Sequence, residues 1–143
     1  MHRSLLAALL GLSASTHVVA AGVCDDAAKE FAAATDAYIK DGSNAFMERL
    51  LKSGPLEGDK RSLGQLQGIT QIEQFFGTIQ SSSVISKKQI GARTCYLVGV
   101  LEYANGPAFA VTTYYRGTKG VGATSMFFRT EPESVFPNQL LIL

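Results

Sequence analysis

The spacing of the apolar residues changes from a helical period to a strand period near residue 81. Before that point, Ala27, Phe31 and Tyr38 recur at i, i+4 and i+11, which is the spacing of one face of a helix. After it, runs rich in Val, Thr, Tyr and Phe lie between turn signals, as strands do. Helices followed by consecutive strands are typical of an α+β domain, so we expect three N-terminal helices packed on an antiparallel sheet of about four strands.

Three helices are predicted in the first half of the chain. The first covers 25–40, and the second covers "AFMERLLK" at 45–52. The third covers "GITQIEQFFGTIQ" at 68–80, and the serines that follow it are expected to end the helix. The stretch 53–62, which is polar and rich in glycine, is expected to be a loop.

Four strands are predicted in the second half, at 84–93, 95–104, 108–116 and 121–130. Asn105–Gly106 separates the second strand from the third. Asn-Gly between two strand-like runs favours a type I′ hairpin turn, which needs two positive φ angles. "GTKG" at 117–120 predicts the next turn. The apolar run "LLIL" at 140–143 is expected either to dock on the core or to form a short final strand.

A register for the sheet follows from these turns. With a loop of Asn105 and Gly106, the facing pairs include Val100 with Val111, Glu102 with Phe109, Met126 with Val111 and Phe128 with Phe109. In that register both faces are largely apolar, whereas an antiparallel sheet with one solvated face alternates more cleanly. We therefore expect one face to cover the helices and the other to meet a second subunit or a bound ligand.

The first twenty residues have the three regions of a secretory signal peptide. "MHR" carries a positive charge, "SLLAALLGLSAS" is an apolar run too short to span a bilayer comfortably, and small residues precede a cleavage point after Ala20 or Ala21. The alternative is an amphipathic or buried N-terminal helix. We expect a signal peptide over 1–20, a single α+β domain over 21–143, and a periplasmic or secreted protein without a transmembrane segment in its mature chain.

Removal of this segment changes the chemistry that is left. Both histidines, His2 and His17, are lost, and the loss of Arg3 balances the remaining basic residues against the acidic ones. A neutral chain without a basic cluster is not expected to bind nucleic acid or an anionic membrane surface. A chain with two cysteines and no histidine does not supply a structural zinc site, and no motif for a metal or cofactor is found.

Cys24 and Cys95 are the only cysteines, and they lie 71 positions apart. In an exported protein this favours a structural disulfide between the start of the first helix and the start of a strand. A lipid anchor on Cys24 is the alternative. It is disfavoured because Ala21 and Val23 occupy positions where the lipoprotein signal prefers a leucine-like and a small residue.

The word "GITQIEQFF" at 68–76 and the long strands after it carry a family resemblance. In its order of elements the chain resembles the nuclear transport factor 2-like superfamily, which includes the SnoaL-like proteins. The resemblance implies a cone in which a curved sheet wraps around helices and encloses a pocket, and frequent dimerisation through the outer sheet face. The chain departs from that pattern at 53–67, where the family has a short strand pair. A cystatin-like arrangement is the alternative.

A pocket of this kind gives a set of candidate lining residues. They are Phe31, Phe76, Val100, Glu102, Phe109, Val111, Met126 and Phe128. Glu102 is the only acidic residue within the strands, so it is also the one candidate, a weak one, for a general base. Lack of catalytic residue types favours a non-catalytic exported module, without a cofactor, that binds a small apolar ligand or a protein partner. The alternatives are a subunit of a bacterial cell-envelope assembly, and a small-molecule isomerase or hydrolase using Glu102 and a tyrosine.

Overall fold

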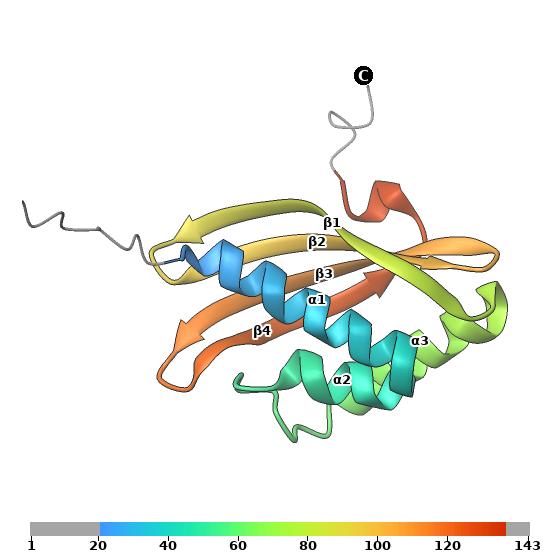
Figure 1. Cartoon of the computed structure of the whole chain (residues 1–143), viewed down its shortest axis with the longest axis horizontal. Coiled ribbons are helices and arrows are strands. Elements are labelled where there is room, and N and C mark those ends of the chain that lie inside the picture. Colours follow the sequence, from blue (N-terminus) through green and yellow to red (C-terminus); the bar gives the residue numbers. More distant parts are fainter. Residues whose placement is uncertain (1–20, 137–143) are drawn as a thin grey trace, which may run out of the picture.

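The structure is a computed structural model that describes residues 21–136. The predicted signal peptide and the "LLIL" run lie outside these residues. Residues 21–136 form three helices, four strands and a short 3₁₀ turn, which are α1 (Val23–Asp41), α2 (Ser43–Leu51), α3 (Ser62–Phe76), β1 (Ile79–Gly91), β2 (Thr94–Tyr103), β3 (Gly106–Gly117), β4 (Gly120–Arg129) and η1 (Pro132–Ser134) (Figure 1). This order confirms the α+β class.

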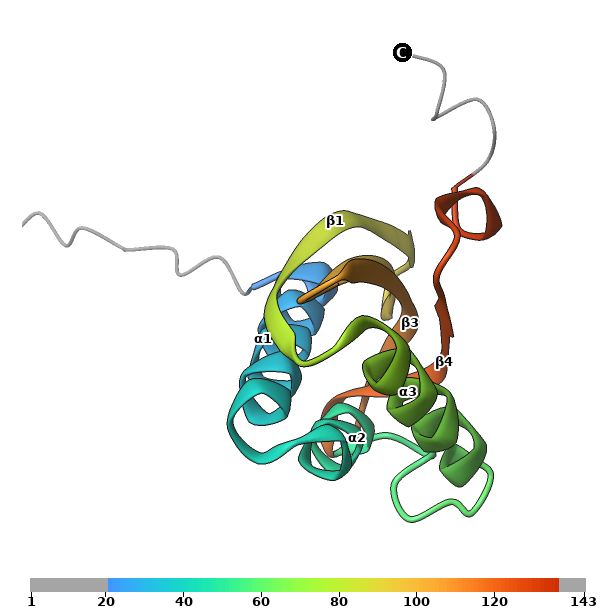
Figure 2. The ribbon, with the colours of Figure 1, turned by 90° about the vertical axis from the view of Figure 1, so that its right-hand side faces the viewer.

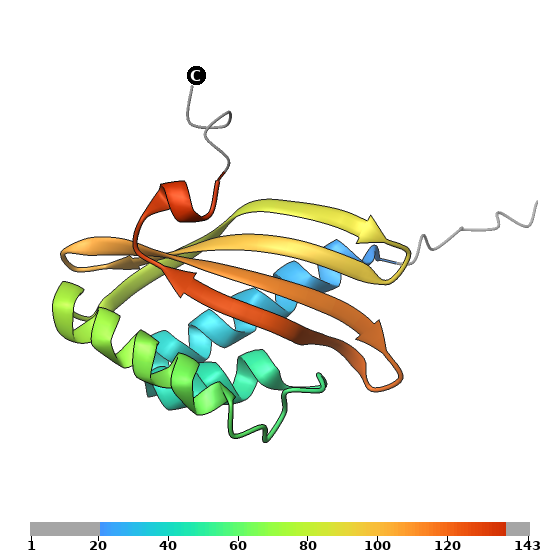
Figure 3. The same ribbon diagram turned by 180° about the vertical axis from the view of Figure 1, so that it is seen from behind.

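The four strands form one antiparallel sheet in the order β1-β2-β3-β4, so that each strand pairs with its neighbour in sequence. The helices all lie against one face, with α1 running along the sheet, and the sheet curls around them when seen end on (Figures 1 and 2). From the other side, the chain after β4 passes across the opposite face toward β1 (Figure 3). We call these the helix face and the outer face.

The apolar stripe of α1 packs on the helix face as its spacing predicts. Phe31 and Tyr38 are almost fully buried, and alanines between them let the helix approach the sheet closely. The Phe31 ring lies directly over Gly99 of β2, where an added Cβ would come within 2.2 Å of the ring. The helix ends at Gly42, whose φ of 92° suits only glycine and whose N–H donates to Tyr38 O. Among residues 21–136, none of the helices is long and apolar enough to cross a membrane.

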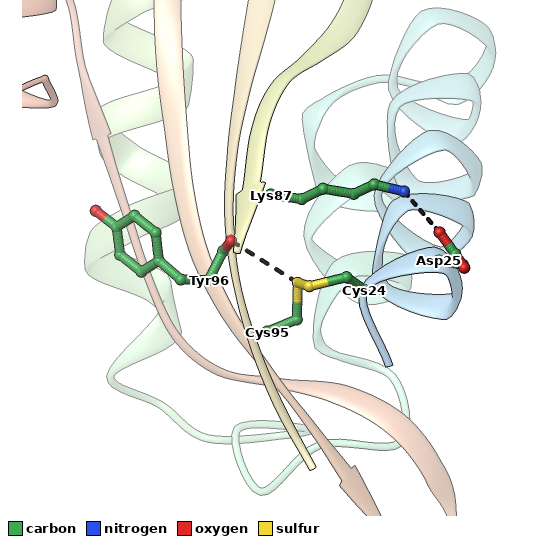
Figure 4. Close-up of a disulfide and its surroundings, with 5 residues drawn as sticks. All are labelled: Cys24, Asp25, Lys87, Cys95 and Tyr96. Carbon is green, nitrogen blue, oxygen red and sulfur yellow. Dashed lines mark hydrogen bonds and ion pairs between the residues drawn. A yellow bond between two sulfur atoms is a disulfide. The ribbon is translucent and has the colours of Figure 1, made fainter. Parts of the chain in front are cut away.

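The predicted disulfide is confirmed. Cys24, in the first turn of α1, is bonded to Cys95 of β2, with their Cα atoms 5.1 Å apart, and Cys95 is fully buried. An ion pair lies beside it, in which Lys87 Nζ of β1 is 2.6 Å from Asp25 Oδ1 (Figure 4). The Lys87 ammonium holds the pKa of the exposed Asp25 carboxyl below its usual value. The disulfide at Cys24 and the ion pair at Asp25 thus both connect the start of α1 to the sheet.

Two predicted boundaries are wrong around α3. The helix begins at Ser62 rather than at 68, because Leu66 continues the apolar face of Ile69 and Ile72 despite the intervening glycines. It ends at Phe76, where Gly77 has a φ of 85° and donates its N–H to Glu73 O. The serines expected to break the helix therefore belong to β1, which begins at Ile79.

The predicted hairpin register of β2 and β3 is wrong by two residues. Tyr103 pairs with Gly106, so Val100 faces Phe109 rather than Val111, and Glu102 faces Pro107. The loop consists of Ala104 and Asn105, and neither central residue has the positive φ of a type I′ turn. Gly106 has a packing role instead, because the Phe76 ring lies where a Cβ would come within 2.5 Å of it.

The predicted partners of Met126 and Phe128 are also wrong, because β4 contains a bulge. The register is as expected near the turn, where Tyr114 faces Ala123. One residue further, Thr113 faces Ser125, which leaves Thr124 unpaired in the ladder. One extra residue moves every later side chain to the opposite face. Met126 and Phe128 therefore face Thr112 and Ala110 on the helix face, rather than Val111 and Phe109 on the outer face.

Both faces of the sheet are apolar, as expected. The helix face joins the three helices in one core, whose larger members include Phe31, Tyr38, Phe46, Leu50, Leu97, Leu101 and Tyr114. On the outer face, Val98, Val100, Phe109 and Val111 are each at most 9% exposed. The chain after β4 covers part of this face, with the Phe136 ring edge-on to Phe109 at a centroid separation of 6.3 Å.

Candidate functional site

A groove of about 390 Å³ lies between α3 and the end of β4. We call it the aromatic groove, and its lining residues are Gly68, Gln71, Ile72, Phe75, Phe76, Phe128, Arg129, Thr130 and Glu131. Ile72 and Phe76 come from the inner face of α3, and Phe128 comes from the helix face of β4. In the helical layer, α3 lies at the side next to β4 (Figure 2), and the groove lies between these two elements.

Phe75 is the most unusual residue of the groove. Its side chain is 81% exposed, although it is one of the largest apolar side chains in the protein. Its ring packs edge-on against Phe76, with ring centroids 5.1 Å apart. Large exposed apolar side chains next to a concave apolar surface are typical of binding sites for ligands or partners. At one end of the groove Arg129 and Glu131 add opposite charges.

The C-terminal end of α3, which forms one wall of the groove, is held by hydrogen bonds. Phe76 O accepts from the N–H of Asn105 at 2.8 Å, so the β2–β3 turn closes on the helix end. The Tyr38 hydroxyl donates to Glu73 Oε2 at 3.0 Å and lies 3.2 Å from the Tyr103 hydroxyl. These contacts join α1, α3 and β2, so the wall is fixed before any ligand arrives.

The two phenols of this network are structural groups. Burial raises the pKa of Tyr103 to about 12. Burial and the hydrogen bond with Tyr103 raise the pKa of Tyr38 further. Both hydroxyls therefore stay protonated at neutral pH, and neither is suited to act as a base.

Replacing Tyr38 by phenylalanine is expected to lower the free energy of unfolding by about 1–2 kcal/mol, because the hydrogen bonds of its hydroxyl are lost. The matched change Tyr114→Phe is expected to raise it by about 1 kcal/mol, since the buried Tyr114 hydroxyl has no hydrogen-bond partner within residues 21–136. Urea denaturation followed by circular dichroism measures both. Equal losses in the two variants would contradict a stabilising role for the Tyr38 hydroxyl.

The structure brings together only two of the predicted pocket residues, Phe76 and Phe128, in the aromatic groove. Phe31 is buried under α1 against Gly99. Met126 lines a smaller cleft of about 250 Å³ nearer the start of β4, with Leu56, Arg61, Ser62, Gln65, Thr124 and Ser125.

The remaining candidates lie on the outer face, away from the groove. Val100, Phe109 and Val111 form its buried centre. Glu102 lies near the hairpin end, opposite Pro107, and its side chain is exposed. Arg129 lies over the Phe127 ring and donates a hydrogen bond to Phe128 O. Within residues 21–136, no three His, Cys, Asp or Glu side chains converge as a metal site requires.

Sequence reasoning missed Phe75, although a signal for it was present. Phe75 and Phe76 are adjacent, and adjacent residues on a helix point about 100° apart. If Ile69, Ile72 and Phe76 form the buried stripe, Phe75 must lie outside it. An exposed aromatic residue beside the stripe could therefore have been predicted.

The chain was compared with models of protein families, with curated proteins and with solved structures. None of these comparisons finds a match.

Proposed function

We propose that this protein is an exported, non-catalytic binding module that takes a small apolar ligand in the aromatic groove. The observation that carries the proposal is the exposed Phe75 beside the apolar floor of Ile72, Phe76 and Phe128. A volume of about 390 Å³ lies within the range of small-molecule sites. The apolar side chain of a protein partner is the alternative occupant.

Two features support export. The first is the signal-peptide pattern of residues 1–20. The second is the Cys24–Cys95 disulfide, because such bonds form and persist in oxidising compartments and are rare in the cytosol. A periplasmic or secreted protein is the proposal that agrees with both.

The resemblance to the nuclear transport factor 2-like superfamily is supported by the order of three helices and a curved four-stranded sheet. The chain still departs from that pattern between α2 and α3, where the described residues form turns rather than a strand pair. The region between helices and sheet is filled by aromatic packing, with ring centroids 5.1 Å apart for Tyr38 and Phe46 and 5.9 Å apart for Phe46 and Phe128. We therefore place the ligand at the edge of the cone, in the groove, rather than along its axis.

A non-catalytic role is supported by the surroundings of the weak catalytic candidate. Glu102 lies on the outer face, across the sheet from the groove, and is open to solvent. General acid–base catalysis needs a titratable group positioned inside the substrate site. Dimerisation through the outer face remains a further proposal, and the Phe136 segment leaves only part of that face free for it.

Binding of the neutral fluorescent probe N-phenyl-1-naphthylamine tests the proposed site. The wild-type protein is expected to enhance the emission of the probe. Phe75→Ser is expected to weaken binding about fivefold or more, because it removes the exposed aromatic wall of the groove. The control is Ile90→Ser, which replaces another exposed apolar side chain (58% exposed) on β1. No enhancement by the wild-type protein, or equal losses in both variants, would overturn the proposed site.

A further inference from the structure

A second cavity, of about 440 Å³, lies on the other side of α3, between α2, α3 and the loop 52–61 that joins them. Its lining residues are Asn44, Met47, Glu48, Leu51, Glu57, Gly58, Ser62 and Leu66. We call it the interhelical cavity. It shares no lining residue with the aromatic groove, so an inference about it stands apart from the proposed function.

The loop that closes the cavity is fixed in place. It is pressed against β4 so closely that a Cβ on Gly122 would lie 2.3 Å from the backbone nitrogen of Gly54. Within the loop, the N–H of Ser53 donates to Glu57 Oε2 at 3.1 Å. Asp59 accepts hydrogen bonds from the backbone and the guanidinium of Arg61. The cavity is therefore formed before a ligand binds, which lowers the entropic cost of binding.

The floor of the cavity is apolar. Met47 and Leu51 of α2 are each 5% exposed, and Leu66 of α3 faces them. A hydrocarbon or aromatic group that enters the cavity covers these side chains, and burial of apolar area favours its binding. The floor thus selects a ligand with an apolar body.

Among the residues that the structure describes, the charged groups that line the cavity are both acidic. Glu48 projects from α2, and Glu57 is oriented by its bond to the Ser53 N–H. The two arginines closest in sequence are engaged elsewhere, because Arg49 is paired with Glu30 of α1 and Arg61 with Asp59. Lys52 and Lys60 belong to the same loop but do not line the cavity. The rim therefore presents two carboxylates above an apolar floor.

We propose that the interhelical cavity binds a small organic cation, with an ammonium group at Glu48 and Glu57 and an apolar body on Met47, Leu51 and Leu66. Charge complementarity chooses this class, since an anion would be repelled by both carboxylates and a neutral apolar molecule would leave them without a counter-charge. Because both carboxylates lie near solvent, each contributes about threefold to affinity, and together they favour the cation about tenfold over a neutral molecule of the same shape.

The test is an NMR titration of the full chain, labelled at methionine, leucine and isoleucine methyl groups, with phenethylammonium and with 2-phenylethanol. These probes differ in one group, an ammonium against a hydroxyl. The cation is expected to shift the Met47 and Leu66 methyl signals and to bind about tenfold more tightly than the alcohol. Equal affinity for the two probes, or shifts near Ile72 instead of Met47, would overturn the proposal.

A double variant assigns the effect to the two carboxylates. Glu48→Gln with Glu57→Gln keeps an acceptor for the Ser53 N–H and is expected to abolish the tenfold preference for the cation, while binding of the alcohol is unchanged. Glu133→Gln, which removes an exposed carboxylate in η1, is the matched control and is expected to leave the preference intact. A preference that survives in the double variant would refute the proposed role of the carboxylates.

Discussion

Replacement of Cys24 and Cys95 by alanine is expected to lower the free energy of unfolding by about 4 kcal/mol. The disulfide closes a loop of 71 residues, and in the chain-entropy treatment a loop of this length restricts the unfolded chain by about that amount. For a domain of this size, such a loss is a large fraction of the total stability. Guanidinium unfolding of the oxidised protein and of the double variant, followed by circular dichroism, measures the difference.

The ion pair beside the disulfide provides the control. Asp25→Asn removes the partner of Lys87 without touching the covalent bond, and the pair is largely open to solvent. It is expected to shift the unfolding midpoint very little, since exposed ion pairs contribute little to stability. If Asp25→Asn destabilised the protein as much as loss of the disulfide, electrostatics rather than the covalent link would hold α1 to the sheet.

Substitution of Gly99 by alanine is expected to cost about 2–3 kcal/mol, because the new methyl group would overlap the Phe31 ring. Phe31 is 1% exposed and is enclosed by the core, so the ring cannot move aside without displacing α1. The measurement is the free energy of unfolding in urea, where a fall in the midpoint at constant slope reports lost stability.

A double-mutant cycle separates this overlap from other effects of the substitution. If Phe31→Leu relieves the overlap, the alanine at 99 should cost much less in that background than in the wild type. Gly64→Ala is the matched control, because an added Cβ at that position of α3 meets no atom within 4 Å. It is expected to raise stability by about 0.5–1 kcal/mol through helix propensity. A large cost of Gly99→Ala in the Phe31→Leu background would exclude the overlap as its cause.

Two parts of the fold could be predicted from the sequence. One follows from the helical spacing of apolar residues, and the other follows from the number of cysteines. The stripe through Phe31 and Tyr38 identifies the buried face of α1 because a helix repeats every 3.6 residues whatever it packs against. The Cys24–Cys95 bond could be predicted because the chain contains no other cysteine. Neither inference needs information about distant parts of the chain.

The register could not be predicted because tertiary contacts set it. The Asn-Gly sequence suggested where the β2–β3 turn should lie, but Gly106 is required for contact with Phe76, which is 30 positions away. The bulge at Thr124 has no local marker, and it decides which face Met126 and Phe128 occupy. The aromatic groove depends on this bulge, because without it Phe128 would lie on the outer face.

The candidate site could be predicted only in part for the same reason. Phe76 belongs to the helical stripe and was found, whereas the wall contributed by β4 follows from a register that the sequence does not specify. The interhelical cavity is even harder to predict from the sequence. The loop that closes it lies against β4 at Gly54 and Gly122, two glycines that the sequence assigns only to a loop and to a strand.

The neighbour-to-neighbour order of the sheet has a consequence for how the chain folds. Each strand needs only the next strand in sequence, so the meander can form by successive hairpins with short loop closures. The packing of α1 on β1 and β2 instead joins segments that are distant in the sequence, as in the hydrogen bond between Ser82 Oγ and Thr35 Oγ1, whose residues are 47 positions apart. We therefore expect α1 to dock on the sheet after the strands have paired, and the Cys24–Cys95 bond to form as it docks.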